Sequence, residues 1–124
     1  MVIDTNIFIE YLRAKDKTLT KLYQLSVNTE LFISSISLYE LYMGATTVDK
    51  EKHINTLTEG FTVLPFTNQV AIKSAKIYQQ LKAKNQMIEF RDIFIAATCI
   101  INDLPIVTLN KKHFDRIAEL RIIE

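Results

Sequence analysis

The sequence predicts an α/β protein in which helices cover both faces of a short, mainly parallel sheet. Its strand-like segments are short apolar runs without regular polar alternation, which is typical of buried parallel strands. Helix-like segments separate these runs along the chain, as in α/β proteins. Only 2 glycines and 2 prolines occur among the 124 residues, which argues against a turn-rich β-sandwich. The length fits a single domain that spans residues 1–124.

Each predicted strand is a short apolar run, and a charged or turn-forming residue lies close to its end. The first run, for example, ends directly at Asp4, and Asn110 closes the fourth. Such runs are expected to be covered on both faces of the sheet. The predicted strands are Val2–Ile3, Leu31–Ser34, Phe61–Pro65, Pro105–Thr108 and Leu120–Ile123.

The segments between these runs carry apolar residues at helical spacing. Thr67–Lys84 has the longest apolar stripe, whereas Phe90–Ile101 is apolar on nearly every face and is predicted to be a buried helix. A helix that ends near Gly44 can be capped at its start by Ser35 or Ser37. The other predicted helices are Ile7–Leu12, Leu19–Leu25, residues 50–60 and Lys112–Ile117.

The composition excludes several classes of protein. A single cysteine rules out a disulfide scaffold and is compatible with a reducing cytosol. No basic leader and no apolar run near the roughly 18 residues of a membrane span are present, so we expect a cytoplasmic protein. The net charge is +1, but Lys73–Arg121 holds nine Lys or Arg against five Asp or Glu. This surplus favours either a solvated helix surface or a polyanion-binding surface.

Polar residues interrupt the sequence at four places that otherwise favour burial. Asp4 and Asn110 each follow an apolar strand, where ligands bind in open α/β sheets. Glu40 lies inside an otherwise apolar helix, and Asp92 begins the most apolar helix. Taken singly, these residues have ordinary structural explanations. Asp4 can cap a helix, Asp92 can stabilise a first helical turn, Glu40 can face solvent, and Asn110 can belong to a turn.

Taken together, the three acids point to a cation. Two carboxylates about 4 Å apart repel each other by roughly 4 kcal/mol at an effective dielectric constant near 20. A cluster of Asp4, Glu40 and Asp92 is therefore tolerable only when protons or a cation neutralise it. Oxygen ligands select a hard divalent ion, Mg²⁺ or Mn²⁺, rather than zinc.

These residues also carry a family resemblance, which extends over nearly the whole chain. The matching segments are Val2–Asn6, Ser37–Gly44, Asp92–Ala97, Val107–Phe114 and Leu120–Ile122. In this order and at this length, the sequence resembles a PIN-domain ribonuclease, and specifically the VapC-type toxin of a toxin–antitoxin pair. The resemblance implies a three-layer α/β/α PIN-like domain with a short, mainly parallel central sheet.

The resemblance also implies an activity and its site. The activity is that of a Mg²⁺-dependent (or Mn²⁺-dependent) endoribonuclease, which hydrolyses RNA phosphodiester bonds with a metal-activated water. Asp4, Glu40 and Asp92 match the metal-binding acids of the family. Asn6 and Thr108 match polar residues that hold the site together. Asn110 falls on a position that is frequently aspartate, and it would orient the water as a catalytic residue.

The implied partners are an RNA substrate, a VapB-like antitoxin protein and a second copy of the chain. Arg91 and Lys111 lie in the basic half and could bind RNA phosphates. Two other classes remain open. A catalytically weak PIN-like module could bind RNA or protein without cutting, and Asn110 is its best support. A receiver-like domain could use Asp4 as a phosphoacceptor, but this reading leaves Glu40 unexplained.

Overall fold

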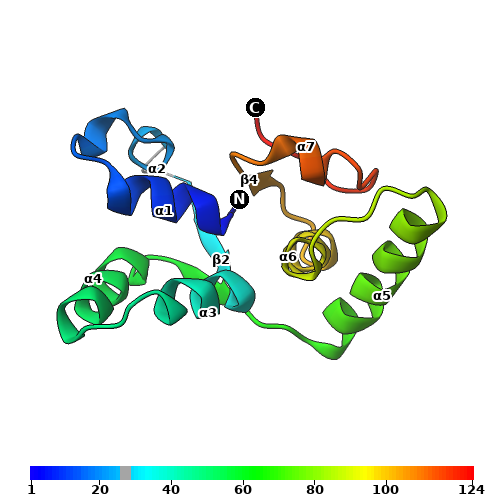
Figure 1. Cartoon of the computed structure of the whole chain (residues 1–124), viewed down its shortest axis with the longest axis horizontal. Helices are drawn as coiled ribbons and strands as arrows, with labels where there is room; N and C mark the ends of the chain where they lie inside the picture. Colours follow the sequence, from blue (N-terminus) through cyan, green and yellow to red (C-terminus); the bar gives the residue numbers. More distant parts are fainter. Residues whose placement is uncertain (26–28) are drawn as a thin grey trace.

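The computed structural model describes residues 1–25 and 29–124 of the chain. Within these ranges, four strands form one sheet in the order β3-β2-β1-β4, and every pairing is parallel (Figure 1). The strands are β1 (Val2–Ile3), β2 (Phe32–Ser34), β3 (Thr62–Leu64) and β4 (Ile106–Val107). Parallel strands point the same way, so their carboxyl ends meet at one edge of the sheet.

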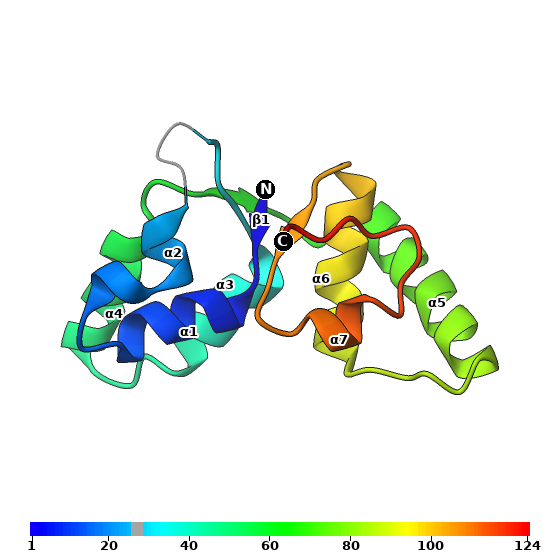
Figure 2. The ribbon, with the colours of Figure 1, turned by 90° about the horizontal axis from the view of Figure 1, so that it is seen from above.

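Helices lie on both sides of this sheet. In both views, α1 to α4 gather on one side, and α5, α6 and α7 lie on the other (Figures 1 and 2). No described helix is both long and apolar enough to cross a membrane. The helices are α1 (Thr5–Arg13), the 3-10 helix η1 (Lys17–Leu19), α2 (Lys21–Gln24), α3 (Ser35–Met43), α4 (Val48–Thr58), α5 (Asn68–Ala83), α6 (Phe90–Ile101) and α7 (Lys111–Phe114).

Two apolar clusters fill the space between the sheet and its helices. Val2 and Ile106 belong to the cluster under α5 and α6, whereas Ile3 and Val107 belong to the cluster under α1 and α3. Successive side chains of a strand point to opposite faces, so each two-residue strand contributes to both clusters. This explains why the strands are apolar without alternation, and it confirms the predicted three-layer α/β/α architecture.

Helix α6 positions one side of the candidate site, and its bounds are the predicted ones. It connects to β4 and packs against α5, and its buried residues include Ala96 and Ala97. Because it leads into a strand parallel to β1, its amino-terminal end lies near the carboxyl edge of the sheet. Asp92, in its first turn, is therefore carried to the edge where Asp4 ends β1.

The predicted helix over Leu19–Leu25 is wrong in part. Thr20 separates the short helices η1 and α2, and its side chain accepts a hydrogen bond from the Tyr23 amide. Lys17 Nζ donates to backbone carbonyls at the end of α1, including that of Tyr11 at 2.6 Å. These polar contacts break the segment, and they leave Leu19 74% exposed rather than on a buried stripe.

Two smaller predictions also differ from the structure. The strand predicted over Leu120–Ile123 reduces to one isolated parallel bridge, between Ile106 and Ile122. The cap of α3 is Ser34, the last residue of β2, rather than Ser35 or Ser37. Its hydroxyl accepts from the Ser37 amide at 3.0 Å, so the helix begins directly at the end of the strand.

Two isoleucines of α5 test how far the core stabilises the fold. Ile77 is 1% exposed and Ile72 is 60% exposed, in the same helix. We expect Ile77→Ala to lower the free energy of unfolding by about 2–5 kcal/mol, because it removes buried methylene groups and leaves a cavity. Ile72→Ala should change it by no more than about 0.5 kcal/mol. Urea unfolding of both variants checks this, and equal losses would contradict the assignment of the core.

Candidate active site

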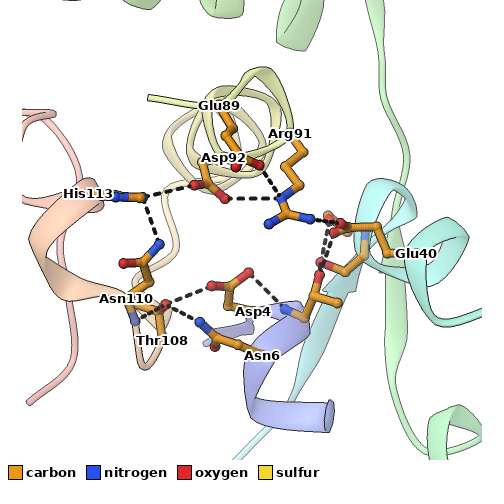
Figure 3. Close-up of polar contacts among 12 residues, drawn as sticks. Asp4, Asn6, Glu40, Glu89, Arg91, Asp92, Thr108, Asn110 and His113 are labelled. Atoms are coloured by element: carbon orange, nitrogen blue, oxygen red, sulfur yellow. Dashed lines mark hydrogen bonds and ion pairs between the residues drawn. The ribbon is translucent and has the colours of Figure 1, made fainter. Parts of the chain in front are cut away.

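The carboxyl edge of the sheet is hollowed by a cavity of about 200 Å³, toward which polar side chains converge (Figure 3). They come from the end of β1, the start of α1, the middle of α3, the first turn of α6 and the segment after β4. The lining residues are Asp4, Thr5, Asn6, Ile9, Glu40, Met43, Arg91, Asp92 and Asn110. The structure thus brings Asp4, Glu40, Asp92 and Asn110, the four residues predicted to be catalytic, to one cavity.

Asp4 is both the cap of α1 and a wall of the cavity. One carboxylate oxygen accepts from the Thr5 amide at 2.8 Å, and the other accepts from the Thr108 hydroxyl at 2.7 Å. The residue is 4% exposed. Burial raises the pKa of Asp4 to about 6, although both hydrogen bonds favour the charged form. Burial of Asp4 therefore favours neutralisation of its carboxylate, either by a proton or by a cation.

Thr108 joins the end of β4 to the start of α1. Its hydroxyl donates to Asp4 and lies 3.4 Å from Asn6 Nδ2 and 2.9 Å from the Asn110 amide, both of which donate. Asn6 Oδ1 in turn accepts from the Leu109 amide at 3.2 Å. The predicted supporting residues Asn6 and Thr108 thus lie in one hydrogen-bonded network with Asp4. We infer that this network fixes the carboxylate.

Glu40 reaches the cavity from the middle of α3, and its side chain is 11% exposed. Glu40 therefore does not face solvent, which was its ordinary structural explanation. Thr5 Oγ1 donates to Glu40 Oε1 at 2.7 Å and lies 2.8 Å from Ser37 Oγ. Ser37 Oγ also lies 3.2 Å from Ser34 Oγ. The sequence does not single out this hydroxyl chain, because it depends on how closely α1 approaches α3.

Asp92 faces the cavity from the first turn of α6, and its side chain is 8% exposed. Burial raises the pKa of Asp92, whereas the contact with His113 and the charge of Arg91 oppose this rise. His113 Nδ1 lies 3.5 Å from Asp92 Oδ2 and 2.8 Å from Asn110 Nδ2. Nδ1 can donate to Asp92 when it is protonated, or accept from Asn110 when it is not.

His113 is a site residue that sequence reasoning misses. It follows Asn110 by three residues, and a helical turn places such residues on the same side of α7. The segment Val107–Phe114 of the family resemblance contains it, but a lone histidine three residues from an asparagine is too common a pattern to identify a site residue. The contact that matters joins two elements, α6 and α7.

Two predicted cations occupy different places. The Arg91 guanidinium lies between acids, with Nη1 2.9 Å from Glu40 and Nε 3.0 Å from Glu89 and 4.0 Å from Asp92 (Figure 3). Lys111 instead forms an ion pair with Glu124 at 2.8 Å and is not part of the cavity lining. Arg91 is therefore the cation that partly balances the acid cluster.

The chemistry of the cavity fits a hard divalent cation. Three carboxylates and two carboxamides, those of Asn6 and Asn110, line it, and burial raises the pKa of both aspartates. In the described ranges, no three acids, histidines or cysteines already lie close enough together to form a metal-binding group. The acids are thus of the chemical type that the ion prefers, while Arg91 lies between Glu40 and Asp92.

Comparison with known proteins identifies the family. The family model of the PIN domain matches residues 1–120. The chain is 37% identical to the ribonuclease VapC of Rickettsia bellii over 130 aligned residues, which cover 99% of this chain and 94% of the relative. It is 32% identical to the ribonuclease VapC1 of Methanocaldococcus jannaschii, with 96% and 82% of the two chains covered.

A solved structure agrees with these sequence matches. VapBC-1 from nontypeable Haemophilus influenzae superposes with a TM-score of 0.85 at 29% sequence identity, and the match covers 99% of this chain and 96% of that chain. The chain belongs to the PIN-domain family and, within it, to the VapC-type ribonucleases.

Proposed function

We propose that this protein is a divalent-metal-dependent endoribonuclease that acts in the cytoplasm as the toxin of a VapBC-type toxin–antitoxin system. One observation carries the proposal. Asp4, Glu40 and Asp92, from three distant segments, line a single cavity at the carboxyl edge of the sheet. The VapC ribonucleases that resemble the chain along nearly its whole length support the same activity.

Each polar residue has a role in this proposal. Asp4, Asp92 and Glu40 would hold Mg²⁺ or Mn²⁺. The ion, when bound, lowers the pKa of a water and stabilises negative charge on the scissile phosphate. When His113 Nδ1 is unprotonated, it accepts from Asn110 Nδ2, and Asn110 Oδ1 would then be the atom that accepts a hydrogen bond from the attacking water. Thr108 and Asn6 hold the Asp4 carboxylate in place.

The RNA strand must approach a cavity lined with acids. Arg91 at the cavity and Lys111 beside it would bind phosphates of the strand and so position it without reading its bases. To bind RNA, Lys111 would have to break its ion pair with Glu124, which is exposed. The surplus of basic residues between Lys73 and Arg121 supports binding of a polyanion.

A VapB-like antitoxin is the proposed protein partner, together with a second copy of the chain. A groove of about 420 Å³ adjoins the acid cavity, and Ile9 and Glu40 line both. Leu12, Leu41 and Ile54 give the groove an apolar wall. A segment that folds on this wall could extend from the groove to the acids, and a basic side chain at its end would neutralise them.

The alternative is a PIN-like module that binds RNA or protein without cutting, and Asn110 favours it because an amide replaces a possible fourth carboxylate. Incubation of the purified protein with total RNA and Mg²⁺, Mn²⁺ or a chelator separates the two. The nuclease cleaves with metal and stops with chelator, whereas the binding module retains RNA in a mobility shift and leaves it intact under every condition.

Neutralising the acids should abolish cleavage. We expect Asp4→Asn and Asp92→Asn each to slow RNA cleavage at least about 100-fold, since the metal supplies several kcal/mol to the transition state. Asp103→Asn is the matched control, because Asp103 follows the other end of α6 and its side chain is 97% exposed. Initial rates on total RNA check this, and a wild-type rate in Asp4→Asn would contradict the assignment.

The metal-free protein should become less stable as the pH rises. The pKa of Asp4 rises from 3.8 to about 6 on folding, so the folded state favours the protonated carboxyl, and that stability is lost as the pH rises through this range. The free energy of unfolding of Asp4→Asn, relative to that of the wild type, should therefore rise by about 2 kcal/mol between pH 4.5 and pH 8.

Urea unfolding in EDTA at several pH values measures this difference. Asparagine keeps one acceptor oxygen for the helix cap but loses the second, which accepts from Thr108, so the pH dependence of the stability difference, rather than its size at one pH, reports the charge of Asp4. Asp103→Asn should change the stability little at any pH. A stability gain in Asp4→Asn that is the same at pH 4.5 and pH 8 would show that ionisation of Asp4 is not its cause.

A further inference from the structure

We propose that Arg91 competes with the divalent cation for Glu40, so that the protein's own guanidinium sets how tightly the site binds metal. This inference rests on the proposed function, because it concerns the same cavity. It goes beyond that function because it assigns control of the metal affinity to a single side chain, that of Arg91. In this proposal, Arg91 occupies the site in the metal-free protein and must release Glu40 when metal binds.

Both oxygens of the Glu40 carboxylate already have a partner. Thr5 donates to Oε1 at 2.7 Å, and Arg91 Nη1 donates to Oε2 at 2.9 Å (Figure 3). A metal that binds Glu40 must therefore displace one of these partners or share its oxygen. Thr5 is buried at the start of α1, so its hydroxyl stays beside Oε1 whether it donates to Glu40 or to Ser37.

Arg91 is the partner that can leave. Its side chain is 55% exposed, whereas those of Glu40 and Asp92 are 11% and 8% exposed. The outer edge of its guanidinium already meets Glu89, whose carboxylate lies 3.0 Å from Nε and is 63% exposed. A guanidinium presents donors on more than one edge, so Arg91 can keep Glu89 while it releases Glu40.

The charges give this competition a definite sign. Arg91 stabilises the acid cluster without metal, and its positive charge would repel a divalent ion in the same cavity. Removing the charge should therefore tighten metal binding. If Arg91 only positioned Glu40 for the metal, removing it would instead weaken binding. The direction of the change thus separates competition from support.

Arg91→Gln tests the proposal, with Mn²⁺ as the probe and calorimetry of the RNA-free, full-length protein as the measurement. We expect the dissociation constant for Mn²⁺ to fall about tenfold relative to the wild type, a moderate value because Arg91 is half-exposed and screened. The control is Arg121→Gln, which removes the same charge from an arginine paired with Asp103 beyond the other end of α6. Its dissociation constant should stay within about twofold of the wild type.

Three results would overturn the proposal. Equal or weaker Mn²⁺ binding by Arg91→Gln would show that Arg91 does not compete, and the proposed function would stand because the wild type binds metal. Equal tightening by Arg121→Gln would reduce the effect to net charge. Failure of every variant and of the wild type to bind Mn²⁺ would remove the metal site itself, and the proposed function with it. Circular dichroism melts establish that the variants are folded.

Discussion

The desolvation of Asp4 and Asp92, buried beside Glu40 at one edge of the sheet, is the constraint on which the rest of the structure depends. Asp4, Glu40 and Asp92 share a small cavity, and burial raises the pKa of both aspartates. A protein core offers no water to offset such charges. Hydroxyl groups, one amide and the guanidinium of Arg91 replace that water. These contacts allow the protein to fold with the acids in place, and the acids can still bind a cation.

The parallel sheet explains why these acids meet although they are far apart in sequence. Strand β1 ends at Asp4, and strand β4 ends before Thr108 and Asn110, at the same edge. Helix α6 runs back toward that edge, because it precedes a parallel strand, and so it delivers Asp92. Asp4 also caps α1, which means that a single carboxylate serves both the local structure and the site. The structural and functional explanations of Asp4 are therefore not alternatives.

The sequence predicts much of the fold, and it predicts Asp4 and Asp92 at the cavity for the same physical reason, whereas Glu40 and Asn110 stand out as polar residues within or directly after apolar segments. A charged residue that ends an apolar strand or begins an apolar helix lies at the end of a buried element. The topology of the sheet then determines at which edge its side chain lies. Thr5, Ser37 and His113 escape prediction, because each acts through a contact between two elements rather than through a pattern along one. The helix predicted around Thr20 is wrong for a related reason, because polar contacts with the end of α1 outweigh the helical periodicity of this segment.

We propose that carboxylate oxygens from three segments of the chain together hold one hard cation. Anomalous diffraction from crystals grown with Mn²⁺ tests it most directly, because the metal is located without reference to any model of the side chains. We expect an anomalous peak in the cavity, within bonding distance of oxygens from Asp4, Glu40 and Asp92. Well-ordered crystals that show no peak there, or a peak only elsewhere on the protein, would contradict it.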